Sequence, residues 1–265
     1  MKKILIVIFL FLLAGGGYFG YQKFKPTQVE EEEKKVINRK ETLVNQLDLE
    51  KRPYVVLRPR EDGRELSLTI SNLKMGEKRV EYELEYQAGT MIQGAFGRID
   101  FEEEPAPVTK KLLLGSCSKG KCTYDKDVSG GSLTLYFEGR EDYSLKGDFT
   151  LNQMEEKEGI FSSRDLKASL GVGTGQLGTN DFVVVFSTMG LPEKVDGQVL
   201  AGPVGFFGAN KSVSEGILTF KTDETEGVKV LGWDGEEWKS YPVEAEDGSV
   251  FAEIDRLGSY VLVSK

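Results

Sequence analysis

Hydrophobic and polar residues alternate along most of the chain after Pro53. In the segment "RVEYELEYQ", residues 79–87, every second side chain from Val80 to Tyr86 is apolar, and the others are charged or carry an amide. A period of two places the apolar side chains on one face of a β-strand and the polar ones on the other. The segments "ELSLTI", "SLTLYF" and "DFTL" repeat the pattern, and turn signals such as Asp62-Gly63 separate them. We therefore predict half-buried strands throughout this region.

Successive strands with no helical segment between them predict antiparallel β-sandwiches. The strand pattern of residues 52–152 favours a first sandwich of the immunoglobulin or fibronectin type III kind. Residues 153–265 repeat the β pattern, and "DFVVVFS" within them is a nearly continuous apolar run, as expected for a strand that is covered on both faces. The predicted fold class is all-β, with two antiparallel β-sandwich domains.

The N-terminal residues follow a different pattern. Two lysines precede an apolar run that begins at Ile4 and extends, with several glycines, to Tyr21. A helix of roughly 18 residues covers about 27 Å, close to the roughly 30 Å hydrocarbon core of a bilayer. Residues 1–21 are therefore predicted to be a transmembrane signal anchor with its N-terminus inside the cell. A cleaved signal peptide is the alternative, because Ala14 and the glycines after it suit a cleavage site.

Residues 22–51 are rich in charge, with four consecutive glutamates from Glu30 to Glu33 followed by Lys34 and Lys35. The apolar residues among them give only a thin helical face, so we predict a charged, solvated linker or stalk. With either interpretation of the N-terminus, the rest of the chain is exported. The expected location is the cell membrane, with a single N-terminal span and the C-terminal domains outside the cytoplasm.

Cysteine usage fits export. The only two cysteines, Cys117 and Cys122, flank "SKGK", a four-residue tip with a glycine. In an exported protein, an even count and a close pair favour a disulfide across the base of a hairpin. A redox dithiol is the rival hypothesis, but the spacing differs from Cys-x-x-Cys and nothing places the pair at the start of a helix. Closing so small a loop stabilises the fold by about 2 kcal/mol, which makes the bridge a local staple.

Charge and composition narrow the function classes. The chain of 265 residues has 34 basic and 43 acidic residues, a formal net charge of −9, and no histidine. The acidic balance argues against nucleic acid as a partner. Because histidine is the commonest general base and a usual zinc ligand, we expect no enzyme activity, no catalytic residue, no cofactor and no metal. An acid-based hydrolase is the alternative, and it requires two carboxyl groups that face each other in a cleft.

A glycine-rich segment, "GVGTGQLG" at residues 171–178, matches the dinucleotide-binding fingerprint by letter. That fingerprint works only where the third glycine opens a helix that holds pyrophosphate, whereas the segment from Asp181 to Ser187 is rich in β-branched valine and predicts a strand. We therefore interpret the segment as a loop that joins two strands.

Large aromatic residues supply the candidate ligand contacts. The segment "GWDGEEWKSYP" places Trp233 and Trp238 around Asp234-Gly235, a tight-turn signal that sets the two rings nearly opposite each other on neighbouring strands. Packing on a hairpin or a core explains the pair. The alternative is an exposed platform for a glycan or a peptide, in which Trp233, Trp238, Phe206 and Phe207 contact the ligand.

In the C-terminal part, the segment "LKASLGVGTGQLGTNDFVVVF" is followed by "GLP" and by "AGPVGFFGANKSVSEGILTFK". This order resembles the ZU-five type β-sandwich domain of ankyrins, netrin receptors and exported bacterial surface proteins. Gly175-Gln176-Leu177, Gly202-Pro203 and the strand from Ile217 to Phe220 occupy the places of that family's motifs. The family's proline-rich step before the first of these is replaced here by Val172-Gly173-Thr174. The resemblance implies a non-catalytic structural or interaction module.

Together these patterns predict a non-catalytic, membrane-anchored cell-surface protein that acts as a structural or protein-interaction module. The alternative function is an extracellular carbohydrate- or peptide-binding module that uses exposed aromatic side chains. The expected partners are the membrane and another surface protein or a glycan.

Overall fold

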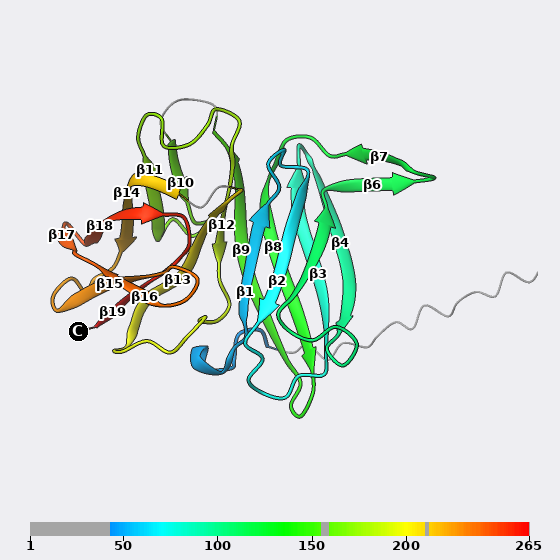
Figure 1. Ribbon diagram of the computed structural model, residues 1–265, viewed down its shortest axis with the longest axis horizontal. Coiled ribbons are helices and arrows are strands. Elements are labelled where there is room, and N and C mark those ends of the chain that lie inside the picture. Colours follow the sequence, from blue (N-terminus) through cyan, green and yellow to red (C-terminus); the bar gives the residue numbers. More distant parts are fainter. Residues whose placement is uncertain (1–42, 155–158, 210–211, 265) are drawn as a thin grey trace, which may run out of the picture. The chain divides into compact units, whose positions relative to one another are not determined.

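The computed structural model describes residues 43–154, 159–209 and 212–264, which belong to one compact unit. Over these residues the protein is all-β: apart from the 3₁₀ helix η1 (Leu49–Lys51), every regular element is a strand (Figure 1). The large sheets are antiparallel and pack face to face over apolar cores. The alternating pattern therefore predicted the fold class correctly as all-β and sandwich-like.

The strands within the described residues are β1 (Tyr54–Pro59), β2 (Glu65–Ser71), β3 (Arg79–Ala88), β4 (Met91–Asp100), β5 (Val108–Leu113), β6 (Gly115–Ser118), β7 (Lys121–Tyr124), β8 (Val128–Glu138), β9 (Tyr143–Gln153), β10 (Gly159–Ser162), β11 (Ala168–Val172), β12 (Phe182–Ser187), β13 (Val199–Gly208), β14 (Ser212–Lys221), β15 (Val228–Trp233), β16 (Trp238–Tyr241), β17 (Glu244–Glu246), β18 (Ser249–Arg256) and β19 (Ser259–Ser264).

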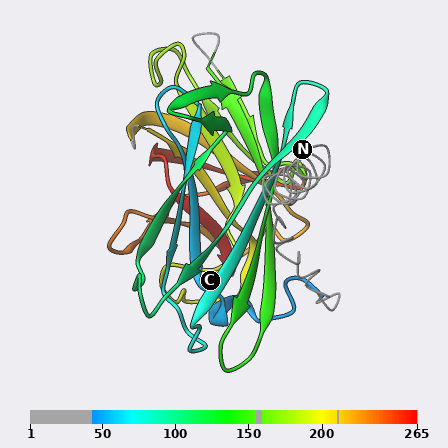
Figure 2. The ribbon, with the colours of Figure 1, turned by 90° about the vertical axis from the view of Figure 1, so that its right-hand side faces the viewer.

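Nine strands form one large sheet, in the order β16-β15-β19-β13-β12-β9-β8-β3-β4. A three-stranded sheet (β1-β2-β5), a five-stranded sheet (β10-β11-β14-β18-β17) and a separate hairpin (β6-β7) complete the topology of the described residues. Figure 1 shows β4 at the side of the molecule away from the five-stranded sheet, and Figure 2 views the molecule from that side.

The two smaller sheets pack on opposite faces of the large sheet. Successive side chains of a strand point to opposite faces, and those of β12 enter two different cores. Val184 and Phe186 lie in the core beneath β1-β2-β5, whereas Val183 and Val185 lie in the core beneath the five-stranded sheet. The prediction that this apolar run is a strand covered on both faces is confirmed.

The large sheet runs through the domain boundary expected between residues 152 and 153. The end of β9 pairs with β12, so that Gln153 lies opposite Phe182. The core beneath β1-β2-β5 also includes Phe207, which comes from β13 in the C-terminal half. Each half thus has a sandwich-like core of its own, and the two cores meet on the shared strands β12 and β13.

The predicted anchor at residues 1–21 and most of the predicted stalk lie outside the described residues. The end of the stalk, residues 43–51, is described; most of its side chains are exposed, and Asn45 within it is hydrogen-bonded to β9. The N–H of Asn45 donates to the carbonyl of Ser144, and its side-chain amide donates to the carbonyl of Lys146, both at 2.9 Å. These bonds occupy backbone groups that a solvated stalk would leave to water. No helix within the described residues is long and apolar enough to cross a membrane.

Candidate interaction site

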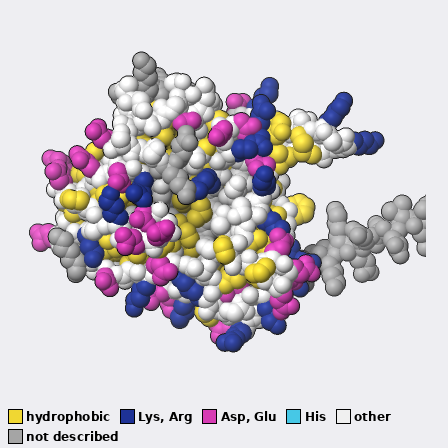
Figure 3. All heavy atoms as spheres, viewed as in Figure 1, with side chains coloured by type: hydrophobic (Ala, Val, Ile, Leu, Met, Phe, Trp, Pro, Cys, Tyr) yellow, Lys and Arg dark blue, Asp and Glu magenta, His cyan; other side chains and the backbone are white. Residues whose placement is uncertain are grey.

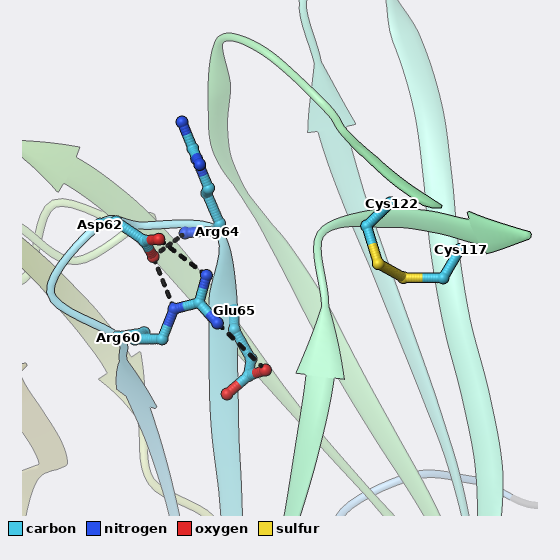
Figure 4. Close-up of polar contacts among 6 residues, drawn as sticks. All are labelled: Arg60, Asp62, Arg64, Glu65, Cys117 and Cys122. Carbon is cyan, nitrogen blue, oxygen red and sulfur yellow. Dashed lines mark hydrogen bonds and ion pairs between the residues drawn. A yellow bond between two sulfur atoms is a disulfide. The ribbon is translucent and has the colours of Figure 1, made fainter. Parts of the chain in front are cut away.

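The hairpin β6-β7 is the element of the described fold that takes no part in either sandwich. It pairs only with itself, with Cys117 opposite Cys122. The two sulfur atoms form a disulfide with a Cα–Cα distance of 4.0 Å, as the sequence predicted. Figure 1 shows the hairpin projecting beyond β3 and β4, and Figure 4 shows the bridge between its strands.

None of the strand residues of this hairpin is buried. An isolated two-stranded hairpin is at best marginally stable in water, so burial of apolar surface cannot account for its order. The disulfide supplies the missing restraint, because it holds the two strands at a fixed register whether or not they pack on anything. Gly115 allows the strands to meet closely at the base, where a Cβ atom would lie 2.2 Å from the carbonyl oxygen of Thr123.

The base of the hairpin is fastened to the first sandwich by polar contacts. The N–H of Leu114 donates to the carbonyl of Arg64, and the guanidinium of Arg64 lies 4.8 Å from the ring centroid of Tyr124. The hydroxyl of Tyr86 on β3 donates to the carboxylate of Asp125 at 2.7 Å. Burial and this bond to an anion raise the pKa of Tyr86 above its ordinary value, so Tyr86 stays a hydrogen-bond donor at neutral pH. The hairpin therefore has a fixed direction at its base.

Arg60, Asp62 and Glu65 form a charge network next to this base (Figure 4). The guanidinium of Arg60 donates two hydrogen bonds of 2.7 Å to the carboxylate of Asp62 and lies 3.5 Å from that of Glu65. The bond from Arg60 lowers the pKa of Asp62 to about 2. Arg60 thus balances only one of the two carboxylates, and the side chain of Arg64 points away from the network in Figure 4.

The exposed charges of the hairpin are all basic. Between Val108 and Tyr124 the chain has four lysines and no acidic residue, although the whole chain is acidic. Lys119 and Lys121 are exposed at the tip. Neither forms an ion pair with another described residue. Figure 3 shows basic side chains, without acidic ones, at the projecting end of the hairpin. The tip of the hairpin is thus an exposed, positively charged surface.

The two tryptophans lie where the turn signal placed them. Trp233 on β15 is opposite Trp238 on β16, with ring centroids 5.4 Å apart and planes at 68°. The indole N–H of Trp238 donates to the carbonyl of Glu193 at 3.1 Å, and its ring packs on a small apolar cluster around Leu231 and Val261. Both rings are only partly exposed. This geometry is that of a packed aromatic pair on a hairpin.

The other two candidate ligand contacts, Phe206 and Phe207, are core residues. Their exposed fractions are 0% and 2%, and the rings lie in different cores because the two residues are neighbours on β13. Neither ring offers a surface to a ligand in this fold. The exposed row of aromatic rings that a glycan platform requires is therefore not formed by these four residues.

A groove with a volume of about 1150 Å³ lies beside the start of β13. Lys146, Lys221, Asp165 and Asp223 are among the residues that line it, so its charges are of both signs. Asp165 accepts hydrogen bonds from the hydroxyl of Ser163 and from the N–H of Lys167, which is the role of a turn residue. Within the described parts of the chain, no three acidic or cysteine side chains gather in a way that could hold a metal ion.

The sequence located the disulfide but not the exposed, basic surface around it. The available signal was the four lysines that precede Cys117 or lie between the two cysteines, in a segment with no acidic residue. What the sequence could not show is that this segment stands clear of the sandwich. Comparison of the chain with protein-family models, curated proteins and solved structures gives no significant match.

Proposed function

We propose that this protein is an exported, membrane-anchored, non-catalytic module that binds another protein outside the cytoplasm through the hairpin β6-β7. The observation that carries the proposal is the hairpin itself: an exposed, basic element whose two strands are joined by a disulfide and contain no buried residue.

Rigidity without burial is useful for recognition. Ordering a loop when a partner binds costs free energy, and an element fixed beforehand avoids that cost. A disulfide also persists in the oxidising environment of exported proteins and is rare in the cytosol. The bridge therefore supports both parts of the proposal, the location outside the cytoplasm and the prepared binding element.

The partner is proposed to be an acidic protein surface. Lys119 and Lys121 present positive charge at the tip of the hairpin, which favours an acidic partner and repels basic ones. A lipid surface is a poorer match, because the tip "SKGK" has no apolar side chain to insert between headgroups. The proposed immunoglobulin-like and ZU-five-like identities of the two halves agree with a scaffold that presents such an element.

The test uses the full-length chain in detergent micelles and a fluorescently labelled polyglutamate peptide as the acidic probe. We expect saturable binding by fluorescence anisotropy, weakened at high salt. The double variant Lys119→Glu, Lys121→Glu should lose most of this binding. The matched control is Arg164→Glu, Lys167→Glu, which reverses two exposed charges in the turn between β10 and β11.

Equal binding by both double variants would show that the hairpin is not the site. Binding of the hairpin to vesicles of anionic lipid, without binding to the peptide, would replace the protein partner with a membrane surface. Export is tested separately by trapping free thiols in intact cells: the two cysteines should be oxidised and resistant to alkylation until a reductant is added.

A further inference from the structure

β4 is the last strand of the nine-stranded sheet, so one of its long sides has no neighbouring strand among the described residues. Its first seven residues, Met91 to Gly97, contain no charge and no proline. Met91, Ile92 and Phe96 are 60%, 73% and 87% exposed. A long, uncharged and apolar edge is a template on which another strand can pair.

The other edges of the described sheets are protected in the ways that natural proteins use. At the opposite end of the large sheet, β16 has only four residues and includes Lys239. In the five-stranded sheet, β10 has four residues, and β17 has three, two of which are glutamates. In the three-stranded sheet, β1 ends in Arg58-Pro59 and β5 includes two lysines. The edge of β4 has none of these protections from Met91 to Gly97, which favours it as a surface on which another strand pairs.

The spacing of the apolar residues on β4 is self-complementary. Ala95 packs against the core, so Ile92, Gly94 and Phe96 share the opposite, outer face. If two copies pair antiparallel about a two-fold axis at Gly94, Ile92 of each copy lies opposite Phe96 of the other. Aromatic and β-branched residues in such positions stabilise a sheet, and the symmetry makes the favourable pair occur twice.

Charge does not oppose this register. Arg98 is exposed on β4 and forms no ion pair with another described residue. In the two-fold arrangement it lies opposite the uncharged Thr90 of the second copy, so no like charges face each other across the two edge strands.

The acidic residues of β3 do not oppose this pairing. The β3 strands of the two copies are separated by three strand spacings, about 14 Å. This separation exceeds the Debye length of about 8 Å at physiological ionic strength, so repulsion between the two rows of glutamates is screened.

We infer that β4 is a homodimer interface, in which two copies of this chain pair antiparallel about Gly94 and join their large sheets into one. The interface is separate from the hairpin β6-β7 and goes beyond the function proposed above. A foreign strand is the competing occupant, but a second copy supplies the matching Ile92 and Phe96 positions twice in one register.

Disulfide cross-linking between two different variants tests the register. Full-length Ile92→Cys and Phe96→Cys chains are prepared separately, mixed in detergent micelles and oxidised mildly. In the mixed dimer the two new thiols face each other, and one native pair of Ile92 with Phe96 is retained. We expect a covalent dimer from the mixture only. In a dimer of one variant, the two new thiols are offset by four residues, about 14 Å, which is too far for a bridge.

Sedimentation equilibrium of the unmodified chain and two lysine variants gives an independent readout. Phe96→Lys should raise the dimer dissociation constant about tenfold or more, since both cross-strand pairs are lost. Ile160→Lys is the matched control, because Ile160 is also an exposed apolar residue, on β10. Thermal unfolding of each variant checks that the fold is intact. A monomer at all concentrations, cross-links that form equally well within each single variant, or a dimer that Phe96→Lys leaves unchanged would overturn the inference.

Discussion

Replacing both hairpin cysteines, Cys117→Ser together with Cys122→Ser, separates local order from global stability. The bridge joins residues with a sequence separation of 5, and closing so small a loop contributes about 2 kcal/mol through chain entropy. If the hairpin unfolded together with the core, the whole loss would appear in global unfolding. For a unit of this size, the melting temperature would then fall by about 4–8 °C.

The structure predicts a different result. None of the strand residues of β6 and β7 is buried, so without the bridge the hairpin can open while the sandwiches stay folded. Most of the lost stabilising free energy then appears as easier local opening of the hairpin. We expect amide hydrogen exchange in residues 115–124 to become about 30-fold faster, the equivalent of about 2 kcal/mol. The melting temperature should fall by less than about 2 °C.

Hydrogen exchange followed by mass spectrometry measures the local opening of the hairpin, with peptides from β8 as the internal reference. Calorimetry measures the melting temperature of the whole unit. The unmodified chain under reducing conditions provides a second sample without substitutions. If exchange in residues 115–124 were unchanged and the melting temperature fell by the whole of about 4–8 °C, the hairpin would belong to the cooperative core. That result would refute the description of the hairpin as a separately stapled element.

Three further predictions concern stability. Gly131→Ala should lower the free energy of unfolding in urea by about 3 kcal/mol or more, because the new Cβ atom would lie 1.8 Å from a backbone oxygen of β3. Gly173→Ala is the control: a Cβ atom there has nothing within 4 Å, so the free energy of unfolding should change by less than about 0.5 kcal/mol. Equal effects of the two substitutions would contradict the close approach of the strands at Gly131. Trp238→Phe should cost about 1 kcal/mol in the same assay, since it removes the donor to the Glu193 carbonyl but keeps an aromatic ring. The folded-state pKa of Asp62, about 2, lies below its ordinary value of 3.8. Its contribution to the stability of the fold is therefore present above about pH 4 and is lost as the pH falls through 2. Asp62→Asn should make the melting temperature depend less on pH in this acid range, and an unchanged pH dependence would contradict the ion pair with Arg60.

Local sequence patterns determined the elements of this protein. The alternation in residues 79–87 predicted β3 because a strand with one buried face requires a period of two. The continuous apolar run of β12 predicted a strand covered twice, and the turn signal Asp234-Gly235 set Trp233 opposite Trp238. Each of these features depends on residues close together in the chain, so the sequence alone was sufficient.

The tertiary structure decided which strands meet. The sequences of β9 and β12 do not predict that these strands pair across the expected domain boundary. Their pairing depends on which sheet edges remain free once the other strands have formed. The same long-range pairing buried Phe206 and Phe207, brought Asn45 into contact with β9, and left β4 and the hairpin β6-β7 uncovered. The sequence by itself thus determined the strands and the disulfide. The tertiary structure alone determined the exposed surfaces, because exposure is a property of the assembled sheets and not of any single segment.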